Sequence, residues 1–199
     1  MKKAVHSSFA LGLAAALFLA AGWIAGTLIP LPVHTNGPAA PLTASSPLAS
    51  LLPSYAAIPD VRQSTGYTCG AAALQAVLAY WGMSEREDRL AARLGSTPEA
   101  GTPPLAILRV AREFGLAADL REGLDLADLE AALASGASVI VDLQAWRDDG
   151  ADRPWSETWE DGHYMVLLAM DAENLTFEDP SLLGPRGVIP RAEFVDRWH

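Results

Sequence analysis

No charged side chain occurs from residue 4 to residue 59, and this neutral stretch limits the part of the chain that can fold as an ordinary globular domain. Lys2 and Lys3 precede the stretch, and the first acidic residue is Asp60. The chain has 199 residues, whereas single domains commonly have about 100–150. We therefore expect one folded domain over residues 57–199, preceded by segments of a different kind.

The first 31 residues have the pattern of a secretory signal. Two lysines are followed by an uncharged apolar run over residues 9–31, close to the ~20 residues that cross a bilayer as a helix. Residues 1–31 are therefore expected to be a signal peptide or a signal-anchor transmembrane helix, with the uncleaved anchor favoured. The two lysines predict that the N-terminus lies on the cytoplasmic side of the membrane. The domain should then face the extracytoplasmic side, tethered to the membrane through this helix, or be periplasmic or secreted after cleavage.

The next segment, residues 32–56, is rich in proline, alanine and serine and carries no charged side chain. Such a composition buries no core and favours extended chain. We expect it to be a linker between the N-terminal segment and the domain.

The charge and cysteine content of the domain exclude several classes of function. All 24 acidic side chains follow residue 59, together with 12 of the 14 basic ones. A surface with this excess of negative charge repels phosphate backbones, so nucleic acid is not an expected partner. The single cysteine, Cys69, allows neither an intramolecular disulfide nor a zinc site of the CxxC type. We expect no metal and no cofactor.

Hydrophobic periodicity and turn residues predict helices first and strands later in the domain. A second helix is expected to begin at Ser84, because Ser84 and Glu87 have the spacing of a capping box. The order of elements indicates an α+β fold in which an N-terminal helical layer packs on an antiparallel β-sheet. The expected elements are helices over residues 69–81, 84–94, 105–114 and 126–135, strands over 138–143, 163–170 and 175–179, and a closing helix over 190–198.

Three residue types suited to nucleophilic catalysis occur at the ends of these elements. Cys69 begins a helix, whose positive end stabilises a thiolate, and Gly70 beside it would let a substrate approach the backbone. His163 begins a strand directly after Gly162, and Asp179 ends the next strand. If the two strands form a hairpin, the histidine and the aspartate lie at the same end of it.

This set of residues would serve acyl transfer. Cys69 would attack as a thiolate, His163 would take and return the proton, and Asp179 would orient the imidazole. Gln63, six residues before the cysteine, would donate its side-chain amide to the oxyanion, together with the backbone N–H of Cys69. Alone, each residue has a plain structural reading, because a free cysteine is more often a small core residue.

The segment QSTGYTCGAAALQAVLAYWG, residues 63–82, resembles the active-site block of the C39 peptidases, which are papain-like cysteine proteases of bacteriocin-processing exporters. The later segments GHYMVLLAM, EDPSLLGPRG and AEFVDRW resemble the histidine strand, the aspartate strand and the closing helix of that family, in the same order. The resemblance covers residues 60–199. It implies a papain-like fold, a thiol protease activity, a triad of Cys69, His163 and Asp179, and the oxyanion role for Gln63.

One insertion departs from the family pattern just before the histidine. Residues 145–162 form an acidic loop, and because its spacing lacks the glutamate of an EF-hand we expect a solvated lid rather than a calcium site. The aspartates concerned are Asp148, Asp149 and Asp152. The loop tryptophans could line a substrate cleft or pack against the sheet, and these are Trp146, Trp155 and Trp159. Trp159, Gly70 and Gly162 are the candidate substrate-binding residues.

The predicted function is therefore that of a cysteine peptidase tethered outside the cytoplasm and acting on a peptide or protein. Exporter-linked members of the family act on the cytosolic side, so leader cleavage after Gly-Gly is not carried over. Two alternatives stay open. One is an amidase or transpeptidase of the same fold acting on another amide, and the other is a catalytically silent peptide-binding module.

Overall fold

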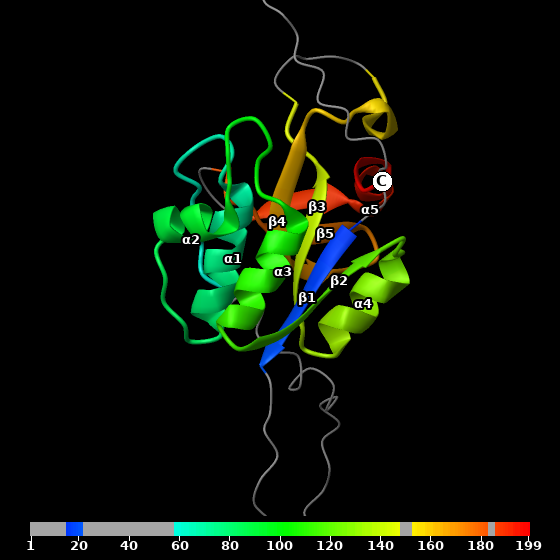
Figure 1. Ribbon diagram of the computed structural model, residues 1–199. Coiled ribbons are helices and arrows are strands. Elements are labelled where there is room, and N and C mark those ends of the chain that lie inside the picture. Colours follow the sequence, from blue (N-terminus) through cyan, green and yellow to red (C-terminus); the bar gives the residue numbers. More distant parts are fainter. Residues whose placement is uncertain (1–14, 22–57, 148–152, 183–185) are drawn as a thin grey trace, which may run out of the picture.

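The computed structural model describes residues 15–21, 58–147, 153–182 and 186–199, which form one antiparallel six-stranded sheet with helices on both faces (Figure 1). The strands lie in the order β2-β1-β3-β4-β5-β6. They are β1 (Ala15–Ala21), β2 (Leu116–Glu122), β3 (Ser138–Gln144), β4 (Gly162–Met170), β5 (Asn174–Glu178) and β6 (Gly187–Pro190). The helices are α1 (Cys69–Tyr80), α2 (Glu87–Leu94), α3 (Pro104–Glu113), α4 (Leu126–Ala134), the 3-10 helix η3 (Trp155–Glu157) and α5 (Arg191–Arg197).

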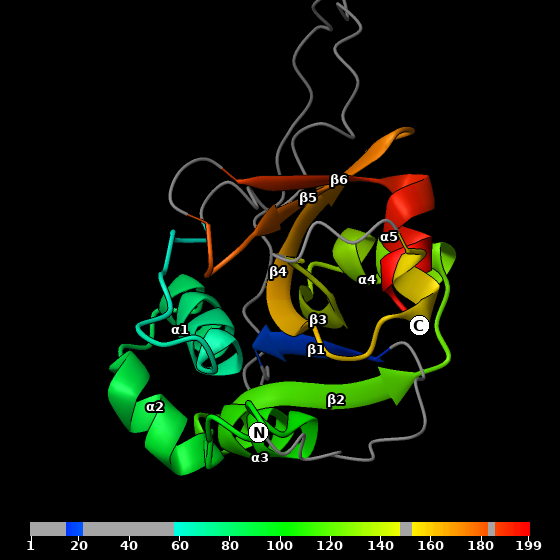
Figure 2. The same ribbon diagram turned by 90° about the horizontal axis from the view of Figure 1, so that it is seen from above.

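The sheet separates two hydrophobic cores, because side chains alternate along each strand. In β4, Tyr164, Val166 and Leu168 face the core that contains α1, α2 and α3. Met165 and Leu167 face the opposite core, which contains α4 and α5. Figure 2 shows the two helical layers on either side of the curved sheet. The predicted α+β fold with an N-terminal helical layer is thus confirmed, and α4 and α5 add a layer on the other face.

The predicted hairpin of the histidine and aspartate strands is also confirmed. β4 and β5 pair antiparallel, from Val166 opposite Glu178 to Met170 opposite Leu175. Consequently the start of β4 and the end of β5 lie at the same end of the sheet. The sequence did not indicate the two outer strands, β2 and β6.

The expected capping box of the second helix is wrong. α2 begins at Glu87 and not at Ser84, with Arg86 as its N-cap and no capping bond from a side chain. The carboxylate of Glu87 instead accepts a hydrogen bond from the backbone N–H of Ser64, at 3.0 Å. A contact distant in sequence therefore replaces the local one, while the predicted end at Gly95 is confirmed by its left-handed φ of 70°.

The apolar N-terminal segment forms a strand where a helix was expected. Ala15–Ala21 pair with both β2 and β3, and Leu17 and Phe18 are buried. No helix among the described residues is long and apolar enough to cross a membrane. A short apolar run has the same pattern in a buried helix and in a strand buried on both faces, which explains the difference. The other residues of 1–31, and the predicted linker 32–56, lie outside the described residues.

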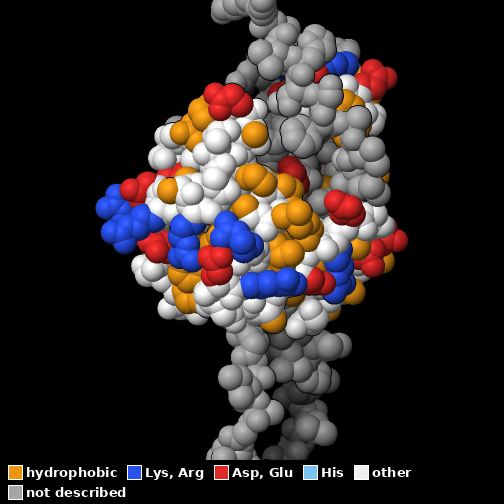
Figure 3. All heavy atoms as spheres, viewed as in Figure 1, with side chains coloured by type: hydrophobic (Ala, Val, Ile, Leu, Met, Phe, Trp, Pro, Cys, Tyr) orange, Lys and Arg blue, Asp and Glu red, His pale blue; other side chains and the backbone are white. Residues whose placement is uncertain are grey.

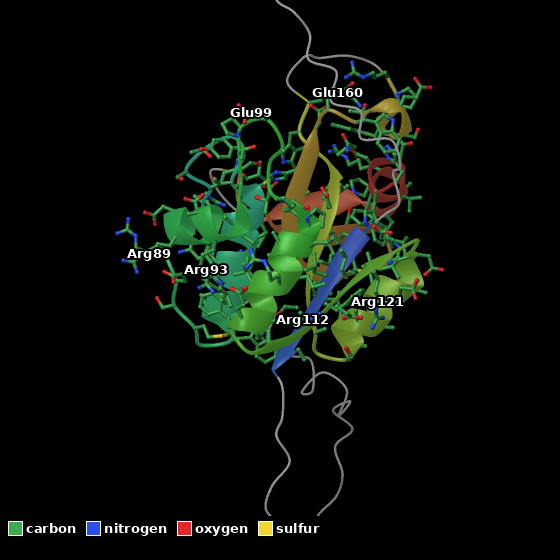
Figure 4. The ribbon with its side chains drawn as sticks, viewed as in Figure 1. Arg89, Arg93, Glu99, Arg112, Arg121 and Glu160 are labelled. Carbon is green, nitrogen blue, oxygen red and sulfur yellow. The ribbon has the colours of Figure 1, made fainter. Side chains whose placement is uncertain are left out.

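Opposite charges alternate on the exposed face of α2, α3 and β2, as Figure 3 shows in blue and red. Arg93 and Arg109 both pair with Glu113, at 2.7 and 2.6 Å. Exposed pairs of this kind contribute only about 0–1 kcal/mol each. Their main effect is to balance the charge of this face, where Figure 4 labels further arginines, namely Arg89, Arg112 and Arg121.

Candidate active site

The start of α1, the start of β4 and the residue after β5 bring three side chains together. His163 Nε2 lies 2.7 Å from Asp179 Oδ1, and the Cys69 side chain is hydrogen-bonded to the same imidazole ring. Because Nε2 faces the carboxylate, Nδ1 is the ring nitrogen that faces the sulfur. The residues are 6%, 5% and 1% exposed in the order cysteine, histidine, aspartate. The arrangement can therefore move a proton between sulfur and imidazole in a site largely closed to water.

The start of α1 leaves its positive end directed at Cys69. Thr68 is the N-cap but makes no capping hydrogen bond through its side chain, and the first turn has no acidic residue. Free amides at a helix start stabilise negative charge on a thiolate or an oxyanion.

Gly70 has a packing role in addition to the one predicted for it. A Cβ at this position would lie 2.7 Å from Cβ of Thr102, so a side chain would collide with the loop before α3. The carbonyl of Thr102 accepts a hydrogen bond from the hydroxyl of Tyr164, at 3.1 Å. The first turn of α1 therefore packs tightly against a loop that is itself bonded to β4.

Electrostatic interactions keep His163 positively charged at neutral pH. Burial alone would lower the pKa of the imidazole, but hydrogen bonds to Asp179 and Cys69, and the negative charges on both, raise this pKa to about 9. An imidazolium beside the sulfur stabilises a thiolate. The site thus places a cation beside the sulfur, an environment that cysteine nucleophiles use.

Both oxygens of the Asp179 carboxylate are occupied. Oδ1 accepts from His163 and also from the backbone N–H and the hydroxyl of Ser181, each at 2.8 Å. Oδ2 accepts from the indole N–H of Trp146, at 2.7 Å. Burial would raise the pKa of Asp179, but the hydrogen bonds and the charge of His163 hold it below its ordinary value. Asp179 is therefore a carboxylate at neutral pH, where His163 is an imidazolium.

Gln63 is anchored beside the aspartate turn by its backbone. Its N–H donates to the carbonyl of Pro180 at 3.0 Å, and its side-chain Nε2 donates to the carbonyl of Thr65 at 2.9 Å. Two residues earlier, the N–H of Val61 donates to the buried carboxylate of Glu178 at 2.9 Å. The side chain of Gln63 is thus bonded within its own loop, and the oxyanion role expected of it stays a prediction.

A second carboxylate near the site was not singled out from the sequence. Asp142 lies opposite Tyr164 in the pairing of β3 with β4, next to the pair of Leu143 with His163. Burial raises the pKa of Asp142 to about 6, although a hydrogen bond to Tyr164 and the charge of His163 act in the opposite direction. An acidic residue within the apolar strand SVIVDL is the sequence signal that could have identified it.

The remaining candidate residues, Gly162 and Trp159, are both exposed. Gly162 is exposed at the start of β4, and Trp159 is half exposed with its ring edge-on to His199 at 4.3 Å. Figure 4 shows Glu99 and Glu160 at the end of the molecule where β4 begins. The three loop aspartates lie outside the described residues, and the part described contains no cluster of three potential metal ligands.

Comparison with known proteins identifies a family over most of the chain. The model of the Peptidase_C39 like family matches residues 55–199. An uncharacterized protein of Methanothermobacter marburgensis is 34% identical over 122 residues, which are 61% of this chain and 71% of that protein.

One solved structure agrees on the fold. The peptidase domain of Streptococcus ComA, a bi-functional ABC transporter involved in a quorum sensing pathway, has a TM-score of 0.54 at 20% identity, covering 69% of this chain and 90% of that one. A double glycine motif protease from an AMS/PCAT transporter, solved in complex with the leader peptide, has a TM-score of 0.46 at 20% identity, covering 70% and 84%.

Proposed function

Because the chain belongs to the Peptidase_C39 like family, we propose that it is a cysteine peptidase that hydrolyses peptide bonds through a thioester on Cys69. The observation that carries the proposal is the contact of His163 with both Cys69 and Asp179, the last at 2.7 Å. A cysteine at a helix start, an imidazole and an orienting carboxylate are the groups that thiol-dependent acyl transfer requires.

In the first half of the reaction, the Cys69 thiolate attacks the carbonyl carbon of the scissile peptide bond. The C–S bond forms, and the carbonyl oxygen becomes an oxyanion that accepts hydrogen bonds from the backbone N–H of Cys69 and the side chain of Gln63. The intermediate collapses as the C–N bond breaks. The imidazolium of His163 gives its proton to the departing amine, which leaves a thioester.

In the second half, water takes the place of the amine. Neutral His163 accepts a proton from the water as its oxygen attacks the thioester carbon, and the C–S bond breaks to return the thiolate. Asp179 holds the imidazole in one orientation during both steps. If an amine attacks in place of water, the same site performs transfer, so the products distinguish hydrolysis from transpeptidation.

Alkylation of the thiol tests the ion pair independently of any substrate. The full chain contains one cysteine, so iodoacetamide incorporation reports Cys69 alone. We expect His163→Ala to slow alkylation at pH 7 by about tenfold or more, because the thiolate loses its cation. His199→Ala is the matched control, since that ring contacts Trp159 and the carbonyl of Asp196. Equal rates in all three proteins would contradict the proposal.

A peptide-library digest tests the reaction itself. The full-length wild type should generate new termini that Cys69→Ala does not, read by mass spectrometry with and without an added amine. Peptide binding without turnover by the wild type would instead favour a silent binding module.

An extracytoplasmic location remains a prediction from the basic and apolar pattern of residues 1–31. We propose it together with the peptidase function, and the substrate would then be a peptide outside the cytoplasm. Fractionation with protease protection tests this location, and a soluble cytosolic product would exclude it.

A further inference from the structure

We infer that Trp146 is a positioning residue of this active site, whose indole N–H holds Oδ2 of Asp179 so that Oδ1 faces His163. The inference rests on the proposed function, because it concerns the same triad. It assigns a role to the loop between β3 and β4, where the sequence indicated a solvated lid whose tryptophans line a substrate cleft or pack against the sheet.

The first observation is how the hydrogen bonds are distributed over the carboxylate. Oδ1 of Asp179 accepts hydrogen bonds from the imidazole and from the backbone N–H and hydroxyl of Ser181. Oδ2 accepts one from the indole N–H of Trp146, at 2.7 Å. A carboxylate that is bonded on one oxygen only can turn about its last torsion. With a donor on each oxygen it cannot turn without breaking a bond, and a buried oxygen left without a donor costs free energy.

The second observation is that Trp146 is itself held firmly. The guanidinium of Arg197 in α5 lies 4.7 Å from the centre of its ring and 3.9 Å from that of Trp155. Arg197 is only 4% exposed and donates to the carbonyl of Gln144 at 3.2 Å. Arg147 stacks on the other ring of this group, 3.8 Å from Trp155. Cations and indole rings therefore alternate through this stack.

The backbone on either side of the loop is also bonded. The N–H of Ala145 donates to the carbonyl of Asp161 at 2.7 Å, so the loop is closed at its base. The N–H of Trp155 donates to Asp196 of α5, at 2.9 Å. The loop thus connects the C-terminal helix to the triad, and the indole of Trp146 is the last group in that connection.

The chemical consequence concerns the charge on Asp179. Burial raises the pKa of this carboxyl, and the indole N–H is among the hydrogen bonds that lower it. Without the indole, Asp179 takes up a proton at higher pH. A protonated Asp179 no longer stabilises the imidazolium beside Cys69, so the pH at which alkylation begins should rise as well.

The test is Trp146→Phe in the full chain, which keeps a ring but removes the N–H. We expect the low-pH limb of Cys69 alkylation to move upward by about one pH unit. Turnover of a peptide should fall about 10–100-fold, mainly in kcat, as is usual for groups that orient a catalytic residue. In an Asp179→Ala background the same substitution should change neither quantity, because it acts through the aspartate.

Trp81→Phe is the matched control, since it removes an indole N–H that donates to Ser138 at 3.2 Å in another part of the sheet. The control should be less stable than wild type, but the low-pH limb of its Cys69 alkylation should not move. The inference would be overturned if the low-pH limb of alkylation stayed unchanged in folded Trp146→Phe. It would also be overturned if the limb moved equally in Trp146→Phe and Trp81→Phe.

A second measurement uses only the wild-type protein. In the wild type, which has six tryptophans, one indole N–H resonance in an NMR titration should shift together with the low-pH limb of alkylation. Six indole resonances that stay constant through the limb would contradict the role of Trp146. Alkylation that does not depend on His163 would instead reject the proposed function, so the two failures are distinguishable.

Discussion

His163 determines the pH above which the site loses its imidazolium charge. Its pKa is raised to about 9 despite burial, by hydrogen bonds to Asp179 and Cys69 and by their charges. Because the folded pKa lies above the unfolded value, the stability that this group contributes is complete below about pH 6.5 and is lost as the pH rises through about 9.

Reactivity should follow the same group. The excess alkylation rate of wild type over His163→Ala should be present at neutral pH and disappear above about pH 9, where the imidazolium is lost. Rates measured from pH 5 to 11 would check this. A difference between the two proteins that persists at pH 11 would show that the imidazolium is not its cause.

Glu178 is a fully buried carboxylate that the proposed reaction does not use. Burial raises its pKa to about 7, against the hydrogen bond from Val61 and the charges of Arg186 and Arg62. Here the folded state holds the proton more tightly than the unfolded state. The contribution to stability is therefore present below about pH 4.5 and falls as the pH rises to about 7.

The substitution Glu178→Gln should remove this loss. Its side-chain oxygen can still accept from Val61 but does not ionise, so we expect the variant to be more stable than wild type at pH 8, by on the order of 3 kcal/mol. The melting temperature of both proteins at pH 5 and pH 8 measures it, with exposed Glu173→Gln as the control. A variant less stable than wild type at pH 8 would show that the charged form is favoured in the fold.

At the scale of single elements, the first turn of α1 depends on the absence of a side chain. Gly70→Ala would place a Cβ 2.7 Å from Thr102. Overpacking of this kind costs about 1–3 kcal/mol, which lowers the melting temperature by roughly 2–4 °C per kcal/mol in a chain of this size. Because Cys69 lies in the same turn, alkylation should slow as well.

Gly66→Ala is the control for this prediction, because no atom lies within 4 Å of a Cβ at that position. It should leave both the melting temperature and the alkylation rate close to those of wild type. If Gly70→Ala behaves like its control, the packing of α1 on the loop before α3 does not position the thiol.

The elements that the sequence predicts correctly have local signals. Asp125 caps α4 with two backbone hydrogen bonds, as expected, and α3 begins at Pro104, one residue before the expected start. The outer strands lack such signals: of the seven residues of β2 only Leu116 is buried, and β6 has four residues. Their positions depend on pairing with strands distant in sequence, which no local pattern encodes.

The residues of the site also divide into those with a local sequence signal and those without one. Cys69 and His163 stand out because the domain has one cysteine and few histidines, and Asp179 follows from the hairpin. The groups that hold the triad in place do not stand out. Trp146 reaches the carboxylate only because α5 and the inserted loop pack together, and that packing has no counterpart in spacing or composition.

At the scale of the whole molecule, β1 connects two parts of the sheet. It pairs with β2 on one side and β3 on the other, and it buries Leu17. In the full chain, Leu17→Asp should therefore destabilise the fold by about 3–5 kcal/mol, because an unpaired charge would enter the core.

A matched substitution outside β1 separates the role of this strand in the sheet from the general effect of a charge in the apolar N-terminal segment. Leu11→Asp changes the apolar run equally but lies outside the described residues. Melting temperatures of both purified variants check the prediction. If Leu17→Asp melts like wild type, residues 15–21 do not belong to the folded sheet.

The position of β1 in the chain also has a consequence for biosynthesis. Its residues leave the ribosome first, but the end of its partner β3 follows about 120 residues later. At ~5–20 residues per second, translation leaves the strand without its partner for roughly ten seconds. During that interval the nascent apolar segment is exposed. Slower elongation would lengthen this interval and faster elongation would shorten it.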